Sequence, residues 1–113
     1  MLAANDRTFD VEVLRAPAPT LVHFWAPWCG LCRLIVPTLM DCHQEWGERF
    51  KLVSINADEN FQLANTYKLT ILPTLLLFER GRLQHRFEGV TSKADLRQSL
   101  DAVLASLSVL QSA

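Results

Sequence analysis

The chain has 113 residues, half of them apolar, and a formal net charge of −1 at pH 7. A chain of this length can bury one hydrophobic core without structural disulfides, so we expect a single domain over residues 1–113. The balanced charge and the absence of a basic cluster argue against nucleic acid and anionic membrane surfaces as partners.

Targeting signals and the number of cysteines indicate in which cellular compartment the protein is located. The first residues lack the basic segment and apolar run of a secretory signal, and no apolar run approaches membrane-spanning length. Three cysteines are an odd number, which argues against a framework of structural disulfides. We therefore expect a cytoplasmic location with no membrane contact.

The first half of the chain predicts alternating strands and helices. In order, we expect an edge strand at 1–4, a short helix that Thr8 caps and that ends before Pro17, a strand at 20–25, a helix at about 29–47 and a strand at 51–56. Pro37 lies inside the long helix, where a proline lacks the N–H donor and predicts a kink.

The second half predicts a short helix, a hairpin and a long helix. Asp58 and Asn60 are candidate caps for the short helix, whose apolar residues are Phe61, Leu63, Ala64 and Tyr67. We expect a buried central strand at 74–78, a strand with a solvated face at 82–87 and a last helix that begins at a capping box of Ser92 and Asp95. This order indicates an α/β fold, with a mixed sheet of four to five strands and about four flanking helices.

Two cysteines, Cys29 and Cys32, are separated by two residues at the predicted junction between the strand at 20–25 and the next helix. The unpaired N–H groups at a helix N-terminus favour a thiolate over a thiol. We expect Cys29 to be the more exposed sulfur, suited to attack, and Cys32 to resolve the product.

Four elements resemble the thioredoxin family in order and spacing. They are Trp-Ala-Pro-Trp-Cys-Gly-Leu-Cys at 25–32, Pro37, Leu-Pro-Thr at 72–74 and Gly-Val at 89–90. The resemblance implies a thioredoxin fold in which the bond before Pro73 is cis and Pro73 lies against the cysteines. It also implies an apolar surface for a substrate peptide, formed by Trp28, Gly30, Leu31, Leu72, Pro73, Gly89 and Val90.

The resemblance further implies a protein-disulfide reductase. Cys29 would attack a substrate disulfide, and Cys32 would then release the reduced substrate from the mixed disulfide. The implied partners are disulfide-containing proteins and a thioredoxin reductase that restores the electrons. We expect a monomer that needs no metal or organic cofactor.

Three positions depart from the family pattern. Leu31 stands where the family has proline, His23 where it has a buried aspartate, and Ser54 where it commonly has lysine. His23 has two interpretations: a proton acceptor for Cys32, or a neutral core imidazole with a hydrogen-bond partner. A more oxidising pair, acting as an oxidant or isomerase, is one alternative function, and a non-catalytic binding module is another.

Cys42 lies on the apolar face of the helix at 29–47, together with Ile35, Leu39 and Trp46. We interpret it as a small core residue. Ten helical residues separate it from Cys32 by about 15 Å, too far for a disulfide or for a shared zinc ion.

Overall fold

The centre of the computed structural model is a five-stranded sheet with the order β1-β3-β2-β4-β5. The structure describes residues 1–112, with side-chain surroundings for residues 1–107. The strands are β1 (Leu2–Ala3), β2 (Thr20–Trp25), β3 (Lys51–Asn56), β4 (Thr74–Glu79) and β5 (Arg82–Phe87). Strand β3 is parallel to β1 and β2, whereas β4 is antiparallel to β2 and β5. The mixed sheet predicted from the sequence is confirmed.

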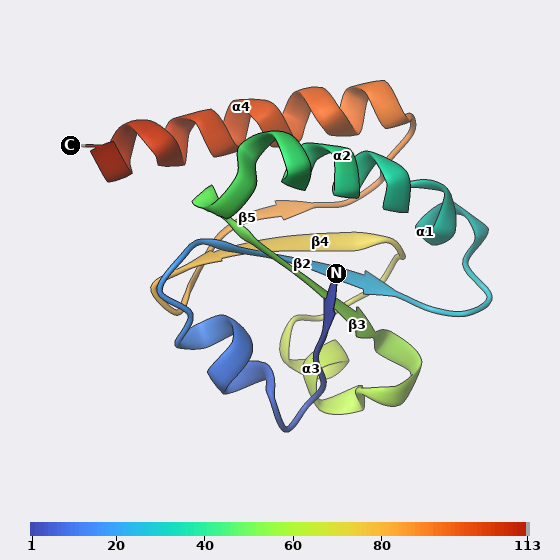
Figure 1. Cartoon of the computed structure of the whole chain (residues 1–113). Coiled ribbons are helices and arrows are strands. Elements are labelled where there is room, and N and C mark those ends of the chain that lie inside the picture. Colours follow the sequence, from blue (N-terminus) through green and yellow to red (C-terminus); the bar gives the residue numbers. More distant parts are fainter. Residues whose placement is uncertain (113) are drawn as a thin grey trace.

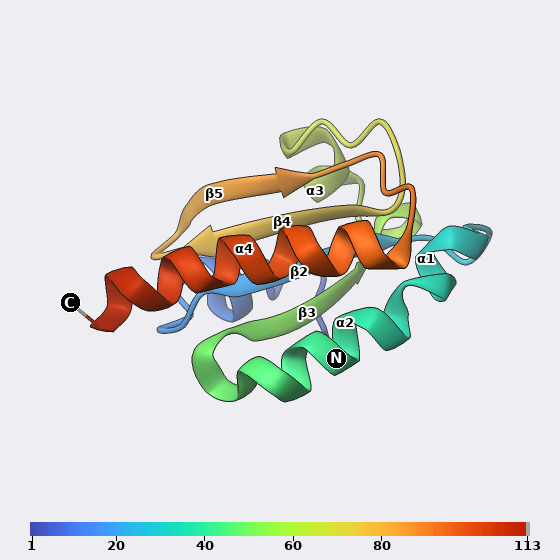
Figure 2. The same ribbon diagram turned by 90° about the horizontal axis from the view of Figure 1, so that it is seen from above.

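Helices cover both faces of the sheet (Figures 1 and 2). The α-helices are α1 (Gly30–Leu34), α2 (Val36–Trp46), α3 (Phe61–Thr66) and α4 (Lys93–Ser112). Single helical turns are η1 (Asp10–Leu14), η2 (Gly47–Arg49) and η3 (Ala57–Glu59). Helices α1, α2 and α4 lie on one side of the sheet, and α3 and η1 lie on the other (Figure 1).

The helix predicted at 29–47 is divided at Ile35, between α1 and α2. Pro37 stands in the first turn of α2, where its missing N–H leaves no hydrogen bond unmade. The predicted kink is confirmed. It lets α1 turn away from the axis of α2 and lie at the end of the sheet (Figure 2). Cys32 belongs to α1, and Cys29 is its N-cap residue.

The sheet is buried on both faces because side chains of successive strand residues point to opposite sides. Leu21 of β2 packs in the cluster beneath α2 and α4, together with Leu39 and Leu100. Its neighbour Val22 packs in the opposite cluster, with Phe9. Burial of each such side chain stabilises the fold by about 1.5–3 kcal/mol.

Two predicted helix caps are wrong. The N-cap of η1 is Phe9, which makes no side-chain cap bond. In the turn before it, the side-chain oxygen of Asn5 accepts hydrogen bonds from the N–H groups of Arg7 and Thr8, and the Thr8 hydroxyl accepts from the N–H of Asn5. In α3 the carboxylate of Asp6 accepts from the N–H of Leu63 at 3.1 Å, while the Asn60 side chain makes no cap bond. The first error is a local one, whereas the cap of α3 comes from a segment that only the folded chain brings near.

Candidate active site

The cysteine pair lies where the chain leaves β2 and enters α1. Cys29 is the N-cap residue of α1, and its sulfur accepts a hydrogen bond from the backbone N–H of Cys32 at 3.1 Å. The two residues form a disulfide, with their Cα atoms 5.3 Å apart. Cys29 is 6% exposed and Cys32 is 1% exposed, so Cys29 is the more accessible sulfur, as predicted.

The segment before β4 forms a second side of the site. The peptide bond between Leu72 and Pro73 is cis, the isomer that the resemblance implies. Leu72 and Trp25 pack against the small cluster formed by Ala26, Cys29 and Cys32. Pro73 itself is buried. The cysteine pair is therefore enclosed by apolar groups from two segments that are 40 residues apart.

Trp28 is exposed and held in place. Its side chain is 68% exposed, and its indole N–H donates to a carboxylate oxygen of Asp58 at 2.9 Å. Together with Phe61, Ile71 and Leu72 it lines an open groove of about 460 Å³. The groove places an apolar surface directly beside the residue that precedes Cys29.

Two exposed residues of this groove, Phe61 and Ile71, were not predicted to line it. Phe61 was expected among the apolar residues of α3 but is 71% exposed, and Ile71 is 46% exposed. No pattern in the sequence identified Ile71 or the anchoring role of Asp58.

The remaining residues of the predicted docking surface lie at the same end of the molecule. Gly30 and Leu31 are exposed in α1, and Gly89 is exposed in the loop between β5 and α4. Figures 1 and 2 both show this loop at the end of the sheet where α1 lies. Val90 is half-buried and packs on the core beneath α2 and α4.

His23 is 2% exposed in the middle of β2. It pairs with Ser54 of β3 and Leu75 of β4, and Leu75 belongs to the core beneath α2 and α4. Neither ring nitrogen has a hydrogen-bond partner among the described residues. Burial lowers the pKa of His23 from 6.5 to about 4, because a charged imidazolium is poorly solvated there. The ring is therefore neutral at pH 7, and the hydrogen-bond partner expected for it is not found.

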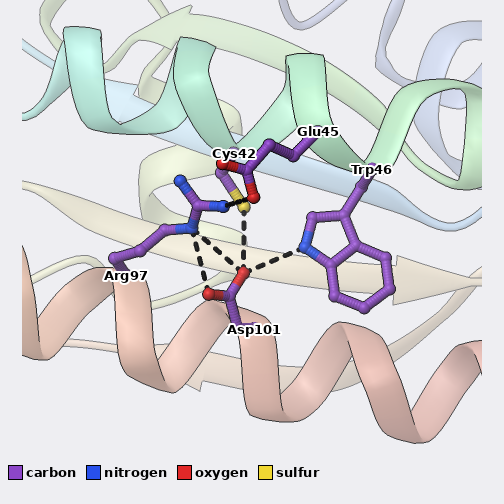
Figure 3. A network of polar contacts seen from close by, with 5 residues as sticks. All are labelled: Cys42, Glu45, Trp46, Arg97 and Asp101. Carbon is purple, nitrogen blue, oxygen red and sulfur yellow. Dashed lines mark hydrogen bonds and ion pairs between the residues drawn. The ribbon is translucent and has the colours of Figure 1, made fainter.

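Cys42 belongs to the core, as predicted, and is fully buried between α2 and α4. Its thiol lies 3.9 Å from an oxygen of Asp101, which also accepts from the indole of Trp46 at 2.9 Å and from Arg97 (Figure 3). Burial raises the pKa of Cys42 to about 11, so the thiol is protonated.

Within the described part of the chain, no three histidine, cysteine or acidic side chains are placed to bind a metal ion.

A disulfide at a helix N-terminus, packed against the leucine of a cis Leu-Pro bond at the end of a mixed sheet, defines a protein of thiol–disulfide exchange. The family model described as thioredoxin matches residues 1–102. The chain belongs to the thioredoxin family.

Relatives of known description support this assignment. The chain is 39% identical to thioredoxin 1 of Synechococcus elongatus over 99 residues, which cover 88% of this chain and 92% of the relative. It is 39% identical to a thioredoxin of Acidithiobacillus ferridurans over 104 residues, covering 92% and 96%. It is also 37% identical to a chloroplastic M-type thioredoxin of Chlamydomonas reinhardtii over 102 residues, covering 90% and 73%. Together with the cysteine pair, these relatives support thiol–disulfide oxidoreductase activity.

Proposed function

We propose that the chain reduces disulfides in proteins, with Cys29 as the nucleophile and Cys32 as the resolving thiol. The observation that carries this proposal is the Cys29–Cys32 disulfide at the start of α1, with the more exposed sulfur first. The N–H of Cys32 already points at the Cys29 sulfur and would stabilise a thiolate there. The thioredoxin relatives support the same chemistry.

The reaction is two successive thiol–disulfide exchanges. The Cys29 thiolate attacks one sulfur of the substrate disulfide, forming a mixed disulfide and releasing a substrate thiolate. The Cys32 thiolate then attacks the Cys29 sulfur, forming the Cys29–Cys32 disulfide and releasing the second substrate thiolate. Two electrons pass to the substrate, and both of its thiolates take up protons.

His23 is proposed as the proton acceptor for Cys32. Its free ring nitrogens and its place in β2, two residues before Trp25 of the cysteine cluster, support this role. His23→Leu removes the acceptor, whereas His23→Asp restores an ionisable group. We expect slower turnover and a changed pH profile in the leucine variant, measured as insulin reduction. An unchanged rate and pH profile would exclude His23 from proton transfer.

The proposed partners are disulfide-containing proteins and a separate thioredoxin reductase. The chain is proposed to act as a monomer and as a single domain over residues 1–113, without metal or organic cofactor.

A dithiol of this kind must be regenerated in reducing surroundings, which supports a cytoplasmic location. Two relatives are described as chloroplastic, so fractionation of the source cells is the relevant test. The described residues include no helix that is long and apolar enough to cross a membrane.

Insulin reduction with dithiothreitol as electron donor tests the proposed function. We expect Cys29→Ser to lose all turnover. Reduced Cys32→Ser, mixed with insulin after the dithiothreitol has been removed, should accumulate a mixed disulfide on a non-reducing gel, because it attacks but cannot resolve. Cys42→Ser is the matched control and should keep wild-type turnover. Turnover that survives Cys29→Ser would contradict the mechanism, and binding without any turnover in the wild-type protein would favour a binding module.

A further inference from the structure

Arg86, near the end of β5, connects that edge strand to the loop that follows α3. One terminal nitrogen donates to the carbonyl oxygen of Tyr67 at 2.5 Å, and the other donates to that of Lys68 at 2.9 Å. Its Nε–H donates to the carboxylate of Glu88. The side chain is 28% exposed, so these bonds are made in partly desolvated surroundings.

The two carbonyl groups lie at the C-terminus of α3, where the backbone lacks hydrogen-bond partners within the helix and one residue has a left-handed conformation. Tyr67 is the C-cap residue of α3, where carbonyls have no partner within the helix. Lys68 has a φ of +51°, in the left-handed region, which costs a residue with a side chain about 1–2 kcal/mol. A planar guanidinium can satisfy both carbonyls at once, whereas an ammonium group cannot offer the same fork.

The loop that Arg86 binds continues into the groove. Residues 69–72 follow Lys68 and line the groove together with Phe61, with Ile71 exposed at 46%. Leu72 packs against the cysteine cluster. On its other side, Arg86 holds Glu88, the residue before Gly89 of the predicted docking surface. Arg86 thus fixes two segments that reach the end of the molecule carrying the disulfide.

We propose that Arg86 is a positioning residue for protein substrates, which holds segment 67–72 in the conformation that docks them. The inference rests on the proposed function. Among the described residues, the hydrogen bonds of Arg86 go to Tyr67, Lys68 and Glu88 and not to either cysteine, so its loss should weaken docking without slowing the chemical steps. A small disulfide, which needs no groove, should be unaffected.

Arg86→Met removes the three guanidinium nitrogens that donate hydrogen bonds and keeps an unbranched aliphatic side chain. Arg86→Lys keeps the positive charge without the planar guanidinium. Arg82→Met removes another exposed arginine from the same strand and is the matched control. We expect Arg86→Met to raise the KM for insulin about fivefold to tenfold at unchanged kcat, with a smaller rise for Arg86→Lys. The reduced variants should react with 5,5′-dithiobis(2-nitrobenzoate) at the wild-type rate, and Arg82→Met should match the wild type in both assays.

Amide hydrogen exchange tests the same inference without enzyme turnover. We expect faster exchange of the N–H groups in 67–72 in the Arg86 variants and wild-type protection in the central strands. Faster exchange with an unchanged KM for insulin would overturn the inference. An equal loss of reaction rate with insulin and with 5,5′-dithiobis(2-nitrobenzoate) would also overturn it. If Arg86→Met does not fold, Arg86→Lys decides by the same criteria. Wild-type protein that reduces neither disulfide would instead contradict the proposed function, before any variant is compared.

Discussion

Among the described residues, the buried side-chain nitrogens without a hydrogen-bond partner belong to His23. A buried polar group without a partner costs about 1–3 kcal/mol, and His23 has two such nitrogens. The lowered pKa adds a pH dependence. Between pH 6.5 and about 4 the unfolded chain binds a proton at His23 and the folded chain does not. The contribution of neutral His23 to the free energy of unfolding is therefore fully present above pH 6.5 and decreases as the pH falls towards 4.

We expect His23→Leu to raise the free energy of unfolding by about 1–3 kcal/mol at pH 7, because leucine fills a similar volume without buried polar atoms. The variant should also lose the part of the acid dependence that His23 contributes, which amounts to about 3 kcal/mol at pH 4 at roughly 1.4 kcal/mol per pKa unit. Urea unfolding at pH 7 and pH 4.5 measures both effects.

Thr20 provides the contrast for this prediction. It is also fully buried in β2, but its hydroxyl donates to the carbonyl of Ala18 at 3.2 Å. Thr20→Val should therefore leave a carbonyl without its partner and destabilise the fold at both pH values. If His23→Leu lowers the free energy of unfolding as much as Thr20→Val does, the imidazole must make a hydrogen bond, and the interpretation of His23 as unpaired is wrong.

Among the secondary-structure elements, α3 depends on a cap from elsewhere in the chain. Asp6→Ala removes the acceptor for the N–H of Leu63 and should lower the free energy of unfolding by about 1 kcal/mol. Asp6→Asn keeps an acceptor oxygen and should lose much less. Asp10→Ala is the control, since the carboxylate of Asp10 lies in an exposed ion pair with Arg15 among the described residues. Equal losses in Asp6→Ala and Asp10→Ala on urea unfolding would show that the cap contributes nothing.

Helices α2 and α4 are joined by Asp101, which accepts from Trp46 and Arg97 and faces the thiol of Cys42 (Figure 3). The indole hydrogen bond is the largest cause of the lowered pKa of Asp101. Asp101→Ala should cost about 1–2 kcal/mol of stability and change the fluorescence of Trp46, while Asp101→Asn should keep part of both. Insulin reduction should stay at the wild-type rate, because the cluster lies along α2 and away from the disulfide. A loss of turnover in a folded Asp101→Ala protein would contradict this separation.

The redox balance belongs to the molecule as a whole, since it compares the stability of the folded disulfide and dithiol forms. We expect a reversible two-electron transition with a potential nearer to about −270 mV than to about −120 mV, the reducing and oxidising ends of this range of proteins. Equilibration with thiol–disulfide buffers, followed by tryptophan fluorescence and thiol alkylation, measures it. A value near the oxidising end would favour the oxidant or isomerase alternative and assign the change to Leu31 and His23.

Local patterns predicted most of the architecture. The apolar run at 20–25, Pro37 and the apolar spacing from Leu96 to Leu107 each produce the element expected of them, because periodicity and proline chemistry act within a few residues. The pairing of Cys29 with Cys32 is equally local.

Contacts between distant segments could not be predicted in this way. Asp6 caps a helix 57 residues later, Asp58 holds Trp28, and Arg86 binds the carbonyls of 67–68. Each contact needs a tertiary approach that no sequence spacing encodes. The missing partner of His23 is likewise a property of its surroundings, which the residue type does not reveal.

The long reach of Asp6 also constrains the order in which the molecule assembles. A six-residue helix is too short to persist in water, and α3 gains its cap only after β1 has docked beside β3. The contact between Asp6 and Leu63 closes a loop of 57 residues. Closing this loop costs conformational entropy before the contact can stabilise the fold. We therefore expect α3 to consolidate after the folding transition state, with φ-values near zero, and to open early as a local unfolding unit that carries Phe61 and one side of the groove with it.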